Sequence, residues 1–146
     1  MAKQRMRAEG NLTQWKNYPK DELLRLDIDR MRSFVVTDDD EIVATFVYML
    51  GVEPTYRYIE DGAWLNDEDY GTIHRIATDG KHKGILKLAT EFALRHVRNV
   101  RIDTDEKNVS MRAALEKLGY VRCGIIYVAD ANGDHEPRIA YQLVGE

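Results

Sequence analysis

The stretch from residue 72 to residue 118 constrains the fold of this chain most, because two strand patterns there alternate with two helix patterns. Residues 72–78 and 100–104 are predicted strands. A helix is predicted after a turn at 79–84, and a second helix over 108–118. The first helix carries its apolar stripe, with a period of 3.6 residues, at Ile85, Leu88, Ala89, Phe92 and then His96 or Val97. Alternating strands and helices of this kind predict an α/β fold.

The segments on either side complete the predicted fold. Apolar residues at i, i+4 and i+7 predict a helix over 19–31. Segments rich in β-branched and aromatic residues predict two antiparallel hairpins, 33–37 with 42–49 and 120–128 with 138–144. An irregular, acidic connection is expected over 51–69. No repeat or linker interrupts the pattern, so residues 1–146 are expected to form a single domain.

Composition excludes several classes of protein. With 44% hydrophobic and 32% charged residues among 146, the chain is expected to fold and is too polar for a membrane protein. Its net charge of −4 argues against a nucleic-acid partner, since phosphate backbones favour basic surfaces. The lone Cys123 and the scattered histidines predict no metal site, and the start of the chain shows no export signal. A cytoplasmic protein is expected.

Charge is unevenly distributed along the chain. Between Glu53 and Asp69 six acidic residues face one basic residue, and between Asp79 and Arg101 six Lys or Arg residues face two acidic ones. An anionic ligand at the second stretch and a cationic ligand near the first would suit this polarity. Two ordinary solvated faces are the alternative.

The turn at 79–84 is bracketed by Gly80 and Gly84 and leads into a helix. Backbone amides at a helix N-terminus have no intrahelical acceptor and lie at the positive end of the helix dipole, so such a turn favours a phosphate group. An ordinary turn is the alternative. The spacing matches neither the P-loop nor the dinucleotide-binding fingerprint.

Several short motifs occur in a set order along the chain. They are Gly10-Asn-Leu-Thr-Gln-Trp15, Trp64-Leu-Asn-Asp67, His74-Arg-Ile-Ala-x-Asp-Gly-x-x-Lys-Gly84, Arg101-Ile-Asp-Thr104, Asn108-x-x-Met111, Glu116-Lys-Leu-Gly-Tyr120 and Cys123-Gly-Ile-Ile-Tyr127. Together they resemble the GCN5-related N-acetyltransferases (GNAT family), and in particular a bacterial branch, over about residues 8–144.

The resemblance implies a GNAT-like fold, in which helices cover both faces of a twisted mixed sheet and the parallel strands 72–78 and 100–104 splay apart. Acetyl-CoA would be the cosubstrate. Its pantetheine arm would pair with strand backbone and its pyrophosphate would lie on the amides of the turn. For Asn108 a plain helix N-cap is the alternative. The residues implied are Ile76, Ala77, Thr78 and Asn108 for the arm, and Lys83, Gly84, Ile85 and Leu86 for the pyrophosphate, where Lys81 and Lys83 add charge. Met111 is a further residue expected to bind the cofactor.

The reaction that the resemblance implies is direct attack of a neutral amine on the thioester, with the carbonyl polarised by a backbone amide near Ile76. His74 is the first candidate for the base, because imidazole titrates near neutral pH, and a packed histidine is its alternative. Asp103 and Tyr127 are further candidates, which would either act as the base or only orient other groups. Water relayed to bulk solvent needs no base residue.

Three departures from the family pattern stand out. Leu115 occupies the position of a tyrosine that protonates the leaving thiolate, so Tyr120 or Cys123 would substitute, or no acid would be used. Leu86 replaces a small residue in the pyrophosphate turn. The first family strand is expected to be absent, which leaves the edge of strand 33–37 bare unless a homodimer covers it. A late start codon or a shortened chain is the alternative explanation.

The acceptor is expected to be a small primary amine. The acidic segment 53–69, with Tyr56, Tyr58 and Trp64, and with Trp15 elsewhere, would line a pocket for its cationic group. The alternative for the two tryptophans is that they cap the core. A catalytically silent acyl-CoA-binding module of the same fold is the alternative function.

Overall fold

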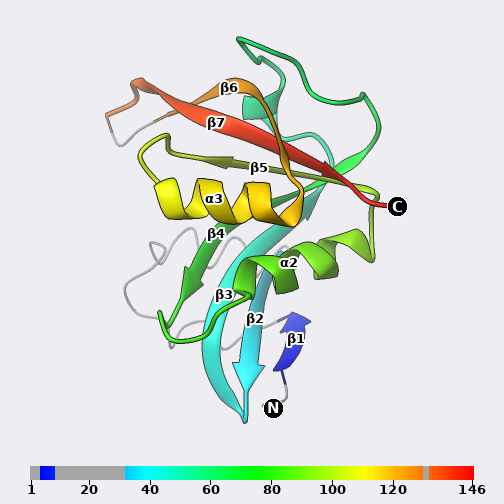
Figure 1. Cartoon of the computed structure of the whole chain (residues 1–146), viewed down its shortest axis with the longest axis vertical. Coiled ribbons are helices and arrows are strands. Elements are labelled where there is room, and N and C mark those ends of the chain that lie inside the picture. The colour runs from blue at the N-terminus through cyan, green and yellow to red at the C-terminus, as the bar shows by residue number, and fades with distance from the viewer. Residues whose placement is uncertain (1–3, 9–31, 130–131) are drawn as a thin grey trace. The chain divides into compact units, whose positions relative to one another are not determined.

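In the computed structural model, residues 4–8, 32–129 and 132–146 are described (Figure 1). The expected helix over 19–31 and the motif at 10–15 lie outside the described residues. The chain divides into two compact units, the first formed by residues 1–49 and 73–92 and the second by residues 50–72 and 93–146. No helix among the described residues is long and apolar enough to cross a membrane.

The first unit is built on antiparallel strands. Its strand order is β1 (Gln4–Ala8), β2 (Ser33–Asp38), β3 (Glu41–Leu50) and then β4 (Tyr70–Thr78), which contributes residues 73–78 to this unit. The turn between β2 and β3 is made by Asp39 and Asp40, both with positive φ. Aspartate tolerates this left-handed conformation better than most residues, so the aspartates at the turn are consistent with the predicted hairpin.

Strand β1 corrects the expectation that the first family strand is absent and that β2 has a bare edge. All five residues of β1 pair in antiparallel register with β2, from Gln4 opposite Asp38 to Ala8 opposite Phe34. The sequence Gln-Arg-Met-Arg-Ala contains no β-branched or aromatic residue, so it lacks the composition that marks a strand. Since β1 covers this edge, the argument for a dimer from a bare edge no longer applies.

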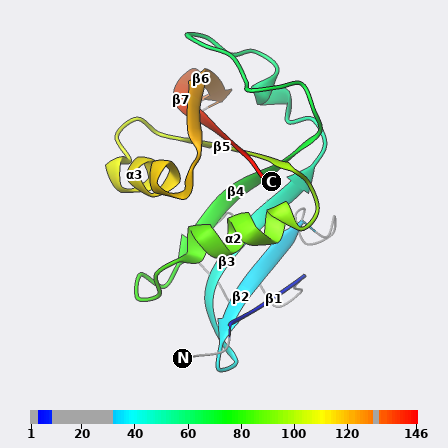
Figure 2. The same ribbon diagram turned by 45° about the vertical axis from the view of Figure 1, so that its right-hand side comes forward.

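Helix α2 (Ile85–Leu94) packs on the strands of the first unit through an aromatic cluster (Figures 1 and 2). The ring of Phe92 lies 4.6 Å from that of Phe34 and 5.7 Å from those of Phe46 and Tyr48. The predicted apolar stripe of this helix therefore supplies the core contact, and it fixes the position of the turn that precedes the helix.

The second unit has the strand order β4 (residues 70–72), β5 (Asn99–Thr104), β7 (His135–Val144) and β6 (Val121–Ala129). β4 and β5 are parallel, and their pairing comprises three residue pairs, from Tyr70 with Asn99 to Thr72 with Arg101. The other pairs are antiparallel. Helix α3 (Val109–Leu118) begins after Asn108 and ends at Gly119, whose φ of 103° is left-handed as expected of a C-terminal glycine. The mixed α/β class is confirmed.

The connection over 51–69 docks on β6. It is irregular as predicted, apart from the short 3₁₀ helix η2 (Pro54–Tyr56). Glu60 and Ile125 exchange two backbone hydrogen bonds of 2.8 Å, which adds a short bridge to the edge of the sheet. Gly62 and Gly124 permit the close approach, because a Cβ on Gly62 would collide with the carbonyl oxygen of Cys123, and one on Gly124 with that of Glu60.

Candidate functional site

The turn before α2 is held by side-chain oxygens of its own residues. Asp79 Oδ1 accepts hydrogen bonds from the amides of Lys81 (2.9 Å) and His82 (3.0 Å). Gly84 has a left-handed φ of 81°, and nothing lies within 4 Å of where its Cβ would be. The first bond of the helix runs from the amide of Leu88 to the carbonyl of Gly84 at 3.0 Å. The first amides of α2 are therefore open to an acceptor other than the helix itself.

This geometry fits the pyrophosphate role expected of the turn. Ile85 is buried, while Lys81, Lys83 and Gly84 are exposed and Leu86 is half-buried. Exposed lysines beside open amides at the positive end of a helix dipole favour an anion. Contacts of the individual residues with a cofactor stay predictions.

His82 joins this turn to the end of β2, a contact that sequence analysis did not identify. Its Nδ1 lies 2.7 Å from Asp79 Oδ2 and its Nε2 lies 2.8 Å from Asp38 Oδ2. Hydrogen bonds to Asp38 and then to Asp79 raise the pKa of His82 above its ordinary value near 6.5. The charged imidazolium therefore holds the turn to the end of β2 and partly neutralises the charges of the two carboxylates. Asp38 is 44 residues away in the chain, so no local pattern marks the pair.

This arrangement predicts a pH-dependent stability. His82 has a raised pKa in the folded protein, so its contribution is complete below about 6.5 and is lost as pH rises through the raised value. The difference in melting temperature between the parent and His82→Gln should be largest near the low end of this window and should shrink as pH increases. Differential scanning fluorimetry across the window measures it. A difference that is independent of pH would contradict a charged bridge.

Strand β4 carries a backbone irregularity at the position expected to polarise a carbonyl. Arg75 has a left-handed φ of 53°, uncommon for a residue with a side chain, in the middle of the strand. Such strained positions cluster at functional sites, because surrounding structure must hold them. Ile76, whose amide is the expected donor, follows directly, and His74, the first candidate for the base, precedes it and is half-buried.

Asp103 is held by two neighbours in the second unit. Tyr56 Oη donates to Asp103 Oδ2 at 2.6 Å, and Arg138 Nη1 lies 3.8 Å from Asp103 Oδ1. Burial, together with the adjacent carboxylate, raises the pKa of Tyr56 well above 10. These contacts are compatible with the alternative in which Asp103 only orients other groups, and its role in the reaction stays a prediction.

Tyr127 forms part of a second hydrogen-bonded group. Tyr127 Oη donates to Glu60 Oε2 at 2.7 Å, and Tyr58 Oη donates to Glu60 Oε1 at 2.6 Å. The hydrogen bonds from Tyr58 and Tyr127 lower the pKa of Glu60, and the bond to Glu60 raises that of Tyr127. Beside the two tyrosines is a cavity of about 320 Å³ lined by Pro54, Thr55, Tyr58, Tyr127 and His135.

The cation pocket expected around Trp64 is taken by a cation of the chain itself. The guanidinium carbon of Arg101 lies 4.2 Å from the ring centroid of Trp64 and 4.0 Å from that of Tyr70. Trp64 Nε1 donates to the carbonyl oxygen of Tyr56 at 2.8 Å, and Tyr56 is buried in the core of this unit. For Trp64 and Tyr56 the expectation of a ligand pocket is therefore wrong, and core packing is confirmed for Trp64. Trp15 lies outside the described residues.

Helix α3 clarifies two further expectations. Asn108 Oδ1 accepts from the amide of Met111 at 3.3 Å, so the N-cap role of Asn108 is confirmed. Leu115 is completely buried, and Tyr120 and Cys123 are also buried. Burial raises the pKa of the Cys123 thiol, which donates to the carbonyl oxygen of Val121 at 3.4 Å. Within the described residues, neither proposed substitute for the missing tyrosine is exposed.

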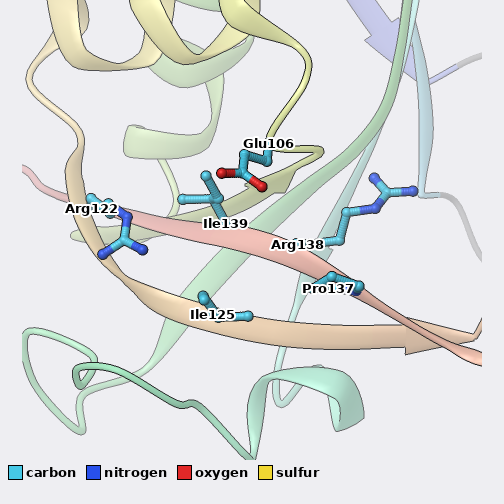
Figure 3. A pocket seen from close by; sticks show the side chains of 6 residues that line it. All are labelled: Glu106, Arg122, Ile125, Pro137, Arg138 and Ile139. Atoms are coloured by element: carbon cyan, nitrogen blue, oxygen red, sulfur yellow. The ribbon is translucent and has the colours of Figure 1, made fainter.

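A second, smaller cavity of the second unit is shown in Figure 3. Its volume is about 80 Å³, far below that of a site for a cofactor or drug-sized ligand. Arg122 and Arg138 lie at opposite ends of the group, with Ile139 between them (Figure 3). The lining residues are Glu106, Arg122, Ile125, Pro137, Arg138 and Ile139.

Comparison with solved structures identifies proteins of the same fold. A GNAT-family acetyltransferase from Streptococcus agalactiae superimposes with a TM-score of 0.79 and 26% identity, and the match covers 98% of this chain and 96% of that chain. A probable acetyltransferase from Staphylococcus epidermidis gives 0.66 and 13%, with all of both chains covered. A chain in a structure of the NatC complex bound to Gag peptide and CoA gives 0.59 and 14%, covering 86% of this chain and 79% of that chain.

Neither a scan against protein-family models nor a search of curated proteins finds a significant match. The structural comparisons show that this chain has the fold of GNAT-family acetyltransferases. The likeness to the acetyltransferase from Streptococcus agalactiae supports an acyltransferase activity in general terms.

Proposed function

We propose that this protein transfers the acetyl group of acetyl-CoA to a small primary amine. The observation that carries the proposal is the turn at Gly84, which is left-handed, exposed and followed directly by the N-terminus of α2. It fits a pyrophosphate, and the likeness to the acetyltransferase from Streptococcus agalactiae extends over nearly the whole chain. Acetyl-CoA supplies an activated thioester when bound.

Each part of the chemistry has a candidate in this chain. Backbone amides of residues 83–86 would hold the pyrophosphate, with Lys81 and Lys83 adding charge, and backbone of residues 76–78 would pair with the pantetheine arm. The Ile76 amide would donate to the carbonyl oxygen, where negative charge develops. His74 would accept the proton that the ammonium loses before its nitrogen attacks. A C–N bond would form as the C–S bond breaks, the thiolate of coenzyme A would leave, and the second proton lost by the nitrogen would pass to that thiolate or to solvent.

The test is calorimetric titration of the protein with acetyl-CoA, followed by assays of thiol release with a panel of amines. We expect a dissociation constant in the micromolar range, which corresponds to a binding free energy of about −8 kcal/mol. We also expect turnover with at least one small primary amine. Binding without turnover on any amine would favour a catalytically silent acyl-CoA-binding module. The buried Leu115, at the position of the tyrosine that would protonate the thiolate, is consistent with such a module. Absence of binding would refute the proposal.

A further inference from the structure

The side chain of His82 bridges two carboxylates that belong to different elements of the first unit. Its Nδ1 lies 2.7 Å from Asp79 Oδ2, within the turn before α2, and its Nε2 lies 2.8 Å from Asp38 Oδ2, at the end of β2. Neutral imidazole has one N–H donor and one acceptor, and an ionised carboxylate is an acceptor only. While both aspartates are ionised, both contacts can be hydrogen bonds only if the ring carries two protons.

The bridge completes a set of bonds that fix the backbone of this turn. The Asp79 amide donates to the carbonyl oxygen of Val43 in β3 at 2.9 Å, and Asp79 Oδ1 accepts from the amides of Lys81 and His82. Asp38 Oδ1 is buried and has no hydrogen-bond partner among the residues that the structure describes. If the ring of His82 lost its second proton, one of the two carboxylates would face a nitrogen lone pair, which disfavours the observed position of the turn.

The charges around His82 favour its protonated form. Hydrogen bonds to Asp38 and then to Asp79 raise the pKa of His82, and partial burial opposes this rise. On β1 the residue opposite Asp38 is Gln4, which does not titrate. The three bridged side chains carry a net charge of −1 when His82 is protonated and −2 when it is neutral, so the protonated form repels a nearby anion less. Further charged side chains on the neighbouring segments are Asp39, Asp40, Glu41, Arg75, Lys81 and Lys83.

We propose that protonated His82 is a positioning residue for the turn before α2, and that loss of its proton weakens the binding of coenzyme A. The inference rests on the proposed function, in which this turn holds the pyrophosphate. The bridge holds the turn to β2 before the cofactor arrives, so less conformational freedom is lost on binding. Affinity should be highest below about pH 6.5 and should fall as pH rises through the raised pKa of His82. By linkage, bound coenzyme A must in turn favour protonation of His82.

The bridge itself can be tested on the free protein. In an NMR titration of the full chain, labelled with ¹³C and ¹⁵N, the ring of His82 should titrate with a midpoint above about 6.5. The backbone amides of Lys81, His82 and Gly84 should shift with the same midpoint. Asp38→Asn should move this midpoint to lower pH, because it removes the carboxylate that stabilises the imidazolium most. A midpoint at or below about 6.5 in the parent, or turn amides that do not follow the titration of His82, would overturn the proposal.

Calorimetric titration with 3′-dephospho-coenzyme A, between about pH 6 and 8.5, tests the effect on binding. This probe keeps the pyrophosphate but lacks the phosphate monoester, whose own pKa of about 6 would complicate the profile. The dissociation constant of the parent should rise about threefold to tenfold over this range. His82→Gln should bind weakly throughout and lose most of the pH dependence, whereas His82→Arg, which stays charged and can donate to two carboxylates, should bind tightly throughout. His96→Gln, a change of an exposed histidine beyond the other end of α2, should retain the profile of the parent.

Proton uptake distinguishes this role from a merely structural one. Calorimetry in buffers of different ionisation enthalpy should show that binding near the midpoint of His82 takes up part of a proton in the parent and none in His82→Gln. Binding that is independent of pH, or that has the same profile in the parent and His82→Gln, would overturn the proposal and leave the coenzyme A site in place. Absence of binding at every pH, with the expected NMR midpoint, would uphold the bridge and refute both the positioning role and the proposed function.

Discussion

Replacing Gly84 by aspartate should weaken binding of acetyl-CoA about tenfold to a hundredfold more than replacing it by asparagine. Aspartate and asparagine both tolerate the left-handed backbone of Gly84, both fit the open space there, and both favour the start of a helix. Only the aspartate places a negative charge beside the pyrophosphate. At about 5 Å and an effective dielectric constant of 20 to 80, that repulsion is about 1 to 3 kcal/mol per unit charge.

Calorimetric titration of both variants measures this effect, and similar melting temperatures would show that both remain folded. Proline is unsuitable at this position, because its φ of about −65° conflicts with the observed 81°. Equal affinities of Gly84→Asp and Gly84→Asn for acetyl-CoA would mean that the pyrophosphate does not lie at the N-terminus of α2.

Replacing Gly124 by alanine should destabilise the fold by about 3 kcal/mol or more. The new Cβ would collide with the carbonyl oxygen of Glu60 and would lie 2.9 Å from Ile59 Cγ1, so the connection over 51–69 would have to move away from β6. Overpacking of this kind costs about 1 to 3 kcal/mol, and a left-handed backbone adds about 1 to 2 for a residue with a Cβ. Urea denaturation measures the free energy of unfolding.

Gly133→Ala is the matched control for this change. Gly133 also has a positive φ, 83°, but nothing lies within 4 Å of where its Cβ would be, so only the backbone cost applies. If the free energy of unfolding falls equally in both variants, the close contact between Glu60 and Gly124 adds nothing to the destabilisation of Gly124→Ala.

Local features of the fold could be predicted from the sequence because neighbouring residues determine them. The apolar stripe that begins at Ile85 identified α2, and Phe92 of this stripe packs on the aromatic rings of the first unit, although the helix ends at Leu94, before the His96 or Val97 of the predicted stripe. Asn108 and Gly119 were expected at the ends of a helix, and the N-cap bond and the left-handed φ confirm both. The glycine-bracketed turn at 79–84 was also recognised, since helix starts and turns depend on a few adjacent residues.

Features that join distant segments could not be derived in this way. β1 is a strand through its backbone pairing with β2, with no strand-like composition of its own. Arg101 is the cation over Trp64, 37 positions away along the chain, where a ligand was expected. Tyr127 lies 67 residues from Glu60, and the sequence placed Tyr127 only as a candidate near the chemistry.

From residue 33 onward, the sequence alone determined the order of the helices and strands, their approximate bounds and the turn that suits a phosphate, because periodicity, capping and turn chemistry operate over a few residues. The tertiary structure alone decided which partner holds each of these charged side chains. Asp103 is paired with Arg138, whereas Glu60 is held by two tyrosines beside a hollow. The physical reason is that the environment of a charged side chain depends on which distant strands and loops pack around it.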